Sequence, residues 1–560
     1  MDNPIQDKQS SVLENAYYRI ASVCFSSYFS YLLLGIAMLV VVVARWHLLS
    51  FPLERDEGEY AYMGKLILDG HAPYSLAYNM KFPGTYYMYA LIMAVFGKSI
   101  TAIHTGLALI SLISMVLIYA ISRNFISKTG SVFAAASFGM MATGWVVLGQ
   151  AAHATHFVTI FALYGTYLLL KLYEKGKHRF FNYFIVGLFF SLAFICKQSG
   201  LFFSMFGASV IIIREFKFSN LLRLFKHLIY FALGFATPVL LMFSYFYFFG
   251  DFDKFWFWTV KYLMKYSDQV PLSEASAMFS LGVSKIMGNY TSEGYIGLWI
   301  VALLGIILVF FDKSNIKNKL IVLAFFLFSA LTIVPGFYFR EHYFITLLPA
   351  IGLLVGVFFE FFHTLFLSYF NKSGLLIINF VVFALLISMG IKANSNYLFV
   401  QDNAESCKQI YGSNPFVESI GIADFLKQNT SKDDKIAVVG SEPQICFYAD
   451  RYSATGYIYT YNLVEVHNYA LSMQQEMAKE IEINQPKYFV YIDVGTSWLC
   501  RPNSERYIFN WAHEYANKYY KLIGIQEIMP SSFSTLLVRE HLKEFLPHSE
   551  EIIYIYERNK

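Results

Sequence analysis

Long apolar stretches recur through the first 400 residues of this 560-residue chain and limit the folds open to it. A helix needs roughly 20 apolar residues to cross about 30 Å of hydrocarbon, where its backbone must satisfy its own hydrogen bonds. Windows of this kind lie at 28–48, 100–121, 131–149, 156–171, 180–195, 201–213, 228–249, 293–311, 320–336, 343–362 and 373–391. We therefore predict a polytopic α-helical membrane protein with about 11 to 13 transmembrane helices.

Charged residues divide the chain into two unlike regions. Residues 401–560 hold 36 of the 82 Asp, Glu, Lys and Arg residues, so this part is far more polar than the rest. Its alternation of strand-like and helix-like segments predicts a small α/β domain. The expected strands are 435–440, 487–494 and 552–556, and the expected helices are 414–428, 464–483 and 503–520. We predict a transmembrane domain at 30–392 and a soluble domain at 393–560.

The sidedness of the membrane region follows from its short loops, because cytoplasmic loops carry an excess of Lys and Arg. Cations concentrate in alternate loops, at 123–128, 171–179, 214–226 and 313–319. These loops are predicted to be cytoplasmic, as is the N-terminal segment 1–29. The long connections 49–99 and 250–292 then lie outside. The soluble domain is extracytoplasmic too, because the number of crossings is odd. Within the first loop, the apolar run 85–96 is too short to span and is predicted to be interfacial or re-entrant.

Polar residues gather at the outer boundary in four places that are far apart in sequence: 55–60, 81–83, 197–198 and 340–343. Lys197 sits barely outside hydrocarbon, where an unused charge is costly. A carboxylate that faces several cations at this depth suits a reaction on a lipid-linked phosphate. The cations neutralise the departing phosphate while the carboxylate takes a proton from an incoming hydroxyl. We expect the four segments to meet around one site.

Several classes of partner and cofactor are not expected. The net charge is only +4 and no basic cluster interleaves with exposed aromatics, so nucleic acid is excluded as a partner. The five cysteines form no CxxC pair, which argues against a disulfide framework. His153 and His156 are spaced i, i+3, but no third ligand is evident, so no metal site is predicted there.

The segment from Arg55 to Ser99 resembles the first external loop of the GT-C membrane glycosyltransferases, in the family 39-like branch of protein O-mannosyltransferases and lipid A aminoarabinose transferases. Members carry an acidic pair soon after the first span, then a tyrosine, then a Lys/Pro element that leads into an aromatic-rich helix. Here these are Asp56-Glu57, Tyr60 and Lys81-Phe82-Pro83, with one residue inserted in the Lys/Pro element. Lys197-Gln198 and the segment 340–349 also resemble elements of the bacterial branch, and the similarity covers roughly residues 28–390.

The resemblance implies a hexosyl- or pentosyltransferase. It would move a single sugar from a polyprenyl-phosphate donor to a hydroxyl of a glycan, lipid or protein acceptor on the extracytoplasmic face, with inversion. Asp56 matches the general base, and Glu57 would shape the acceptor side. The candidate substrate-binding residues are Tyr60, Lys81, Lys197, Gln198, Arg340, His342 and Tyr343. No cofactor is expected, although Glu54 and Glu59 would allow a divalent ion.

Two other functions stay open at this stage. One is a ligase that moves a whole polyprenyl-diphosphate glycan, and the other is a non-catalytic exporter or flippase of lipid-linked sugars. The short N-terminus and the lack of a retention signal favour a bacterial inner membrane as the location.

Overall fold

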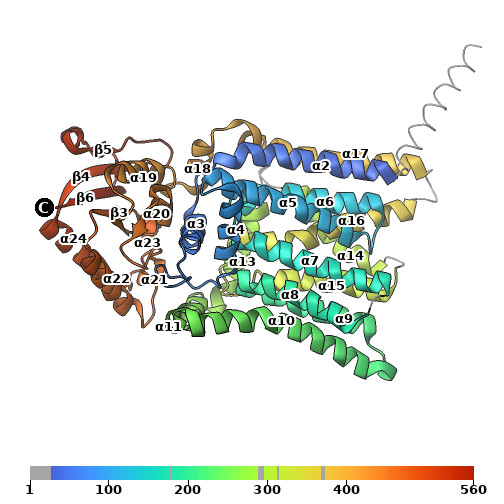
Figure 1. Ribbon diagram of the computed structural model, residues 1–560. Coiled ribbons are helices and arrows are strands. Elements are labelled where there is room, and N and C mark those ends of the chain that lie inside the picture. Colours follow the sequence, from blue (N-terminus) through green and yellow to red (C-terminus); the bar gives the residue numbers. More distant parts are fainter. Residues whose placement is uncertain (1–26, 177, 288–294, 312–313, 367–371, 560) are drawn as a thin grey trace, which may run out of the picture.

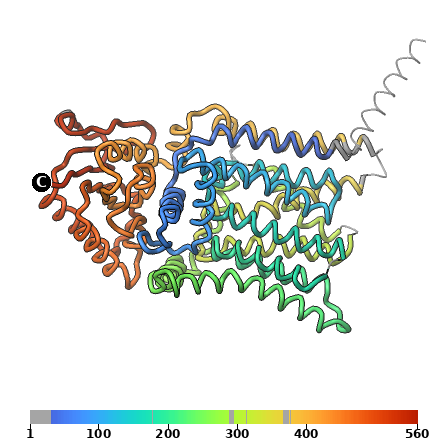
Figure 2. The backbone as a smooth tube through the Cα atoms, in the orientation of Figure 1, coloured from blue at the N-terminus to red at the C-terminus, as the bar shows by residue number. Residues whose placement is uncertain are grey.

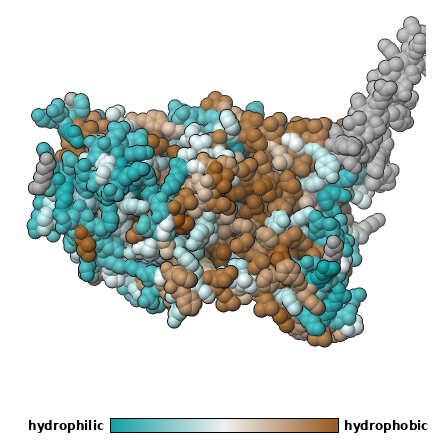
Figure 3. Space-filling model, in the orientation of Figure 1, coloured by the Kyte–Doolittle hydropathy of each residue, from teal (hydrophilic) through white to brown (hydrophobic). Residues whose placement is uncertain are grey.

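The computed structural model describes residues 27–176, 178–287, 295–311, 314–366 and 372–559, so most of the predicted N-terminal segment 1–29 lies outside the described residues. The chain forms a long helical bundle with an α/β domain at one end (Figure 1). The side chains on the visible face of the bundle form a broad apolar band. Polar residues cover the α/β domain and the far end of the bundle (Figure 3). This arrangement confirms the predicted fold class.

A helix lies in each predicted apolar window. The helices are α2 (Ser27–His47), α5 (Ile100–Ser122), α6 (Lys128–Met141), α7 (Ala154–Lys175), α8 (Phe180–Cys196), α9 (Leu201–Glu215), α10 (Leu221–Phe249), α14 (Ile296–Phe311), α15 (Ile316–Leu331), α16 (Leu348–Phe366) and α17 (Lys372–Ala393). Among the described residues, five helical segments are both long and apolar enough to span a membrane: Ser30–Ser50, Ile100–Ser122, Ala154–Lys175, Phe218–Phe249 and Leu348–Leu365. The number of crossings stays a prediction.

The window 131–149 is not one continuous helix, and this part of the prediction is wrong. Helix α6 ends at Met141, and a buried irregular segment follows until α7 begins at Ala154. The guanidinium of Arg45 donates hydrogen bonds to the carbonyls of Ala142 and Gly149. Non-helical backbone inside a helical bundle needs such partners, because no water is available there to form hydrogen bonds with its N–H and C=O groups. Sequence periodicity does not reveal a partner that comes from another helix.

A second irregular segment replaces the end of the window 320–336 and the start of the window 343–362. Helix α15 ends at Leu331 and α16 begins only at Leu348, with a 3₁₀ turn at Glu341–Thr346 between them. The backbone φ angle is positive at Phe337 and Phe339, at 56° and 44°. Such conformations are strained in non-glycine residues and persist where the surroundings hold them. This segment carries Arg340 and His342 to the end of the bundle beside the C-terminal domain.

Short helices form a layer between the bundle and the α/β domain: α3 (Arg55–Leu68), α4 (Gly84–Phe96), α11 (Phe252–Trp256), α12 (Leu263–Ser267) and α13 (Ala275–Met287). Helix α3 begins where the Glu54 side chain caps it by accepting a hydrogen bond from the Glu57 backbone N–H. Helix α4 has 13 residues, or roughly 20 Å, and is too short to cross the hydrocarbon. In Figure 2 the segment that contains α3 lies directly against the C-terminal domain.

The C-terminal domain is built on a mixed six-stranded sheet in the described part of the chain, with strand order β2-β1-β3-β6-β4-β5. The strands are β1 (Lys435–Val439), β2 (Tyr452–Ser453), β3 (Tyr488–Asp493), β4 (Tyr520–Glu527), β5 (Leu537–Val538) and β6 (Ile552–Arg558). Strand β1 pairs in parallel with β2 and β3, whereas β6 pairs in antiparallel fashion with β3 and β4. The sequence predicted β1, β3 and β6 but missed the others.

The helices of this domain in the described residues are α18 (Asn403–Tyr411), α19 (Glu418–Asn429), α20 (Pro443–Ala449), α21 (Tyr461–Val464), α22 (Ala470–Asn484), α23 (Gly495–Trp498) and α24 (Tyr507–Tyr519). Helix α19 packs on one face of the sheet, and α22 and α24 pack on the other. Alternate residues of β1 enter different cores, as the twofold repeat of a strand requires. Ile436 and Val438 belong to the core that includes α19. Ala437 and Val439 belong to the core that includes α22 and α24. Helix α19 begins at Glu418 instead of Pro415, after a turn.

Helices α8 and α10 cross at closely apposed glycines. A Cβ atom added to Gly234 would overlap the carbonyl oxygen of Phe184, and one added to Gly187 would overlap that of Phe231. Small residues of this kind let helices in a membrane approach until their backbones touch.

We predict that Gly234→Ala lowers the thermal stability of the detergent-purified protein by about 1–3 kcal/mol, because the two backbones must separate. Gly35→Ala is the matched control, because nothing lies within 4 Å of a Cβ atom there. Gly35→Ala raises the helix propensity as much as Gly234→Ala does, but it creates no steric overlap with a neighbouring helix. A Gly234→Ala protein that melts no lower than the Gly35→Ala protein would contradict this packing.

Candidate active site

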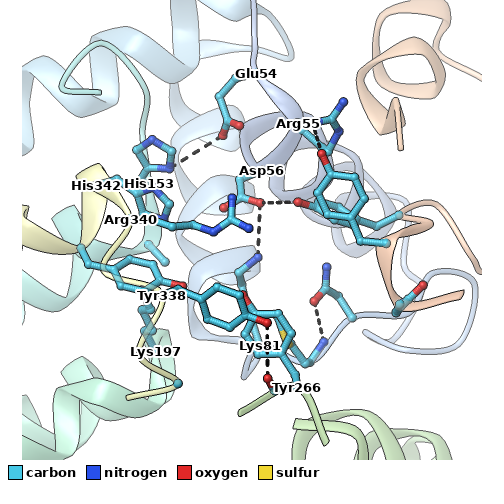
Figure 4. Close-up of a pocket in the computed structure, with 18 of the residues that line it drawn as sticks. Glu54, Arg55, Asp56, Lys81, His153, Lys197, Tyr266, Tyr338, Arg340 and His342 are labelled. Atoms are coloured by element: carbon cyan, nitrogen blue, oxygen red, sulfur yellow. Dashed lines mark hydrogen bonds and ion pairs between the residues drawn. The ribbon is translucent and has the colours of Figure 1, made fainter. Parts of the chain in front are cut away.

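A cavity of about 680 Å³ lies where the bundle meets the C-terminal domain. Its walls come from the start of α3, the segment before α4, the α8–α9 connection, the segment before α16, and residues 459–501 of the C-terminal domain. Figure 4 shows the labelled side chains converging on this space from separate elements. The size falls within the usual range for small-molecule sites.

Of the predicted site residues, all but one line this cavity: Asp56, Tyr60, Lys81, Lys197, Gln198, Arg340, His342 and Tyr343. The four boundary segments therefore do meet, as their common depth predicted. Their roles in catalysis or binding are a separate matter and stay predictions.

Glu57 is the exception among the predicted residues, because it does not line the cavity. Its carboxylate is completely buried and accepts a hydrogen bond from the Ala152 backbone N–H at 2.6 Å, and it lies 3.2 Å from His104 Nε2. Its neighbours are thus α5 and the irregular segment before α7. The predicted role on the acceptor side does not fit this position. Glu57 instead binds the backbone of the segment before α7, which includes His153. Adjacent residues on a helix point in directions about 100° apart, and here that rotation turns Glu57 away from the cavity that Asp56 lines.

Asp56 is the central carboxylate of the cavity. Lys81 Nζ lies 3.6 Å from Asp56 Oδ1, and the hydroxyls of Tyr459 and Tyr60 lie 3.3 Å and 3.4 Å from its two oxygens. Burial opposes ionisation, but the positive charges of the surroundings, that of Lys81 above all, outweigh it and hold the pKa of Asp56 at about 2. The group is therefore an anion at neutral pH.

Glu59, which does not line the cavity, fixes the position of the Lys81 ammonium. The Lys81 ammonium lies 3.4 Å from Glu59 Oε2, and Tyr86 donates a hydrogen bond to Glu59 Oε1 at 2.9 Å. Burial acts to lower the pKa of Lys81, but the carboxylates of Asp56 and Glu59 outweigh it and raise that pKa above its ordinary value. Lys81 thus stays charged between two acids and beside the cavity.

Lys197 and Arg340 form the opposite wall. In the described part of the chain neither makes an ion pair with a carboxylate. Lys197 lies over the ring of Tyr343, at 3.6 Å from its centroid, and Arg340 lies beside Tyr338. Burial, and then the charge of Lys81, lowers the pKa of Lys197 to about 7. In Figure 4 the guanidinium of Arg340 points toward Asp56. These two cations are placed to receive an anion from outside.

Two histidines complete the wall beside Asp56. The rings of His153 and His342 stack with their centroids 4.1 Å apart and an angle of 12° between their planes. One ligand atom from each histidine and one from Asp56 lie within 4.8 Å of one another, so these are the residues that can hold a metal ion. His156 is buried elsewhere and does not line the cavity. The sequence analysis considered His153 together with His156 and predicted no metal site, whereas the residue that stacks on His153 comes from the segment before α16.

Several aromatic residues of the cavity were missed by the sequence analysis. Tyr459 and Tyr461 come from the C-terminal domain, while Tyr266 and Tyr338 come from the segments around α12 and before α16. The alternation of tyrosines at 457, 459 and 461 is the one signal that points to them. Tyrosine rings offer stacking faces, and their hydroxyls can take part in hydrogen bonds, which suits a sugar.

A buried ion pair joins the C-terminal domain to α3. The Arg55 guanidinium donates to Glu442 Oε1 at 2.9 Å and to the carbonyl of Ser441 at 2.7 Å. Glu442 is fully buried and Arg55 nearly so. Gly58 makes this contact possible, because a Cβ atom there would lie 2.7 Å from the backbone nitrogen of Gln444. The domain is thus part of the site and holds the residue next to Asp56.

The comparisons with known proteins agree with this architecture. The profile of the family described as dolichyl-phosphate-mannose-protein mannosyltransferase matches residues 80–244. The structure of ArnT from Cupriavidus metallidurans bound to undecaprenyl phosphate is 11% identical. It aligns over 95% of this chain and 98% of ArnT with a TM-score of 0.51.

The archaeal oligosaccharyltransferase AglB from Archaeoglobus fulgidus, in complex with an inhibitory peptide and a dolichol-phosphate, is 14% identical. It aligns over 94% of this chain and 75% of AglB with a TM-score of 0.50. The chain has the fold of the GT-C membrane glycosyltransferases. Curated protein sequences give no match. In this GT-C fold the cavity lies at the end of the bundle that carries the C-terminal domain.

We predict that Glu442→Gln weakens the attachment of the C-terminal domain, because it leaves the buried Arg55 charge without its counter-ion at a cost of about 3–5 kcal/mol. Limited proteolysis of the purified protein should then release the domain faster. Lys98→Gln is the control, since it breaks a more exposed pair with Asp69 that contributes under about 1 kcal/mol. Equal cleavage rates for the two variants would contradict the proposed attachment.

Proposed function

We propose that the protein transfers a single sugar from a polyprenyl-phosphate donor to an acceptor hydroxyl at the extracytoplasmic face, with inversion and with Asp56 as general base. The observation that carries this proposal is the arrangement of the cavity. One ionised aspartate faces Lys81, Lys197 and Arg340 across a space large enough for a phosphosugar. The match to a family of lipid-phosphate-dependent transferases supports the same reading.

In the proposed reaction, the cations bind the phosphate of the donor. A phosphate that leaves the sugar gains negative charge, and preorganised cations stabilise that charge more strongly than water does. Lys197 and Arg340 have no competing carboxylate in the described residues, so a bound phosphate is their natural partner. Both relatives above were solved with a polyprenyl-type lipid phosphate. For this chain we place the donor phosphate between Lys197, Arg340 and Lys81.

Asp56 acts on the acceptor, as the base that takes the proton from its hydroxyl. A carboxylate with a pKa near 2 is a weak base, so the free site is not yet matched to proton abstraction. A donor phosphate placed among the cations offsets the charges that depress this pKa, because like charges raise the pKa of a neighbouring carboxylate. Donor binding would therefore make Asp56 more basic just when the acceptor needs it. The acceptor is a hydroxyl of a glycan, lipid or protein, and inversion follows from a single displacement.

Two other functions predict different outcomes in one assay. Membrane vesicles receive a labelled polyprenyl-phosphate sugar or, in a parallel sample, a labelled polyprenyl-diphosphate glycan, each with an extract of cell-envelope acceptors. Transfer of the label with release of polyprenyl phosphate supports the proposal. Movement of the intact lipid across the bilayer indicates a flippase, and release of polyprenyl diphosphate from a diphosphate-linked glycan indicates a ligase. Either of those two results would overturn the proposed reaction.

We predict that Asp56→Asn reduces turnover by about 100-fold or more while donor binding is retained, because an amide cannot accept the proton. The vesicle assay gives the turnover, and a filter-binding assay with the labelled donor gives the affinity. Asp69→Asn, on the same loop but outside the cavity lining, is the matched control and should keep its activity. Full activity of Asp56→Asn would contradict the role as general base.

A pH prediction follows from Lys197. Its pKa is lowered to about 7, so the ammonium is charged below that pH and neutral above it. If it binds the donor phosphate, kcat/KM for the donor should fall as pH rises through about 7, by up to about tenfold per unit. Lys197→Arg keeps its charge and should move this fall to higher pH. An unchanged pH profile in Lys197→Arg would show that this lysine does not meet the phosphate.

A further inference from the structure

The C-terminal domain turns one edge of its sheet toward the cavity. Strand β1 runs parallel to β2 and to β3. The segments that follow the carboxyl ends of β2 and β3 supply much of the cavity wall, with Tyr459, Tyr461, Trp498 and Arg501. In open sheets with parallel strands, ligands bind in the crevice outside the carboxyl ends of the strands. The placement of this edge points to a ligand that contacts the domain itself.

Glu465 is a carboxyl group of this wall that the proposed reaction does not use. It follows α21 and lines the cavity. Tyr262 donates a hydrogen bond to its Oε2, whereas no described residue donates one to its Oε1 or forms an ion pair with the group. Burial raises the pKa of Glu465 to about 7, so a fraction of the molecules carries the protonated form at neutral pH. Such a carboxyl group both accepts and donates hydrogen bonds, as sugar hydroxyls do.

Asn462 lies three residues before Glu465 and has an unsatisfied side chain. It lines the cavity with only 5% of its surface exposed, and its Oδ1 has no hydrogen-bond partner among the described residues. Buried amide oxygens are normally paired, because an unpaired one costs stability. A hydroxyl of a ligand in this part of the cavity would supply the missing donor.

Aromatic rings border the same part of the cavity. The rings of Tyr266 and Tyr338 stack with their centroids 4.7 Å apart and an angle of 20° between their planes (Figure 4). Both residues line the cavity. Burial, and then the charge of Glu465, raises the pKa of Tyr338 above its ordinary value, so these two groups lie near each other. The wall thus combines an aromatic surface with a carboxyl group and an amide.

We propose that this wall is the acceptor subsite and that the acceptor is a glycan, whose sugar ring packs on the two tyrosines and forms hydrogen bonds with Glu465 and Asn462. A flat aromatic surface beside planar polar groups suits a ring that carries several hydroxyls. An extended peptide is often bound through the backbone of a free sheet edge. In the described part of the chain, however, no residue of a strand lines the cavity.

The position of this wall favours the acceptor over the donor as its ligand. The lipid tail of the donor belongs in the apolar band of the bundle, whereas polar residues cover the α/β domain (Figure 3). Arg501 lines the cavity and is exposed, so the cavity reaches water on the side of the domain. A glycan in water can therefore approach from this side. Its role as acceptor rests on the proposed function, but the binding of a sugar ring does not.

The first test measures glycan binding in the absence of any donor. Full-length protein in detergent is applied to an array of cell-surface oligosaccharides and to an array of peptides that contain Ser and Thr. We expect binding to a set of the glycans and not to the peptides. Glu465→Ala and Asn462→Ala should each lower glycan binding at least about tenfold. Glu514→Ala is the matched control, since Glu514 is an exposed glutamate of the same domain outside the cavity lining.

Glu465→Gln guards against loss of binding through misfolding. The amide keeps the size of the side chain and its ability to form hydrogen bonds, so this variant should bind glycans better than Glu465→Ala does. The proposal is overturned if the wild type binds no glycan or binds the peptides instead. Equal glycan binding by the wild type and Glu465→Ala would overturn it too, as would a Glu465→Gln protein that binds no better than Glu465→Ala.

The second test uses the vesicle assay, with the glycan that binds best on the array as acceptor. Glu465→Ala should raise KM for this glycan at least about tenfold and leave KM for the donor unchanged. A rise in KM for the donor alone would overturn the assignment to the acceptor. Absence of sugar transfer by the wild type would overturn the proposed function, and with it the role as acceptor, but not the glycan binding that the array measures.

Discussion

Positive charge without a matching carboxylate is the constraint around which the cavity between the bundle and the C-terminal domain is organised. Within the described residues, Lys197 and Arg340 make no ion pair, and Lys81 is shared between Asp56 and Glu59. Charges held this close together in a partly buried space repel one another unless an anion joins them. A lipid-linked phosphate is an anion that is available at this depth of a membrane. The cavity is therefore suited to bind an anion, which in the proposed function is the donor phosphate.

The rest of the fold serves to hold these charges in place. Two interruptions of the helical bundle, after Met141 and after Leu331, bring His153, Arg340 and His342 to the cavity on irregular backbone. Arg45 satisfies the first of these interruptions from within the bundle. The C-terminal domain closes the site through the Arg55–Glu442 pair and places Tyr459 against Asp56. Irregular segments thus carry His153, Arg340 and His342, whereas Asp56 lies in the first turn of the regular helix α3.

The sequence predicted the parts that depend on local pattern. Apolar windows located the helices of the bundle, and the depth shared by Asp56, Lys81, Lys197 and Arg340 predicted that these residues would meet. It failed where the outcome depends on a distant partner. Nothing near His153 in sequence indicates that His342 will stack on it, and nothing near Tyr459 indicates that it will reach Asp56. Glu57 lies outside the cavity lining although it adjoins Asp56, because the order of residues in a motif does not show the direction in which each side chain points.

The most direct test of the account is an electron cryomicroscopy structure of the full-length protein in a lipid nanodisc with polyprenyl phosphate bound. The account predicts that the phosphate lies within hydrogen-bond distance of Lys197 and Arg340, with the lipid tail leaving along the bundle and Asp56 facing the opposite side of the cavity. A phosphate bound at the other end of the bundle, or outside the cavity with Lys197 and Arg340 left free, would contradict it.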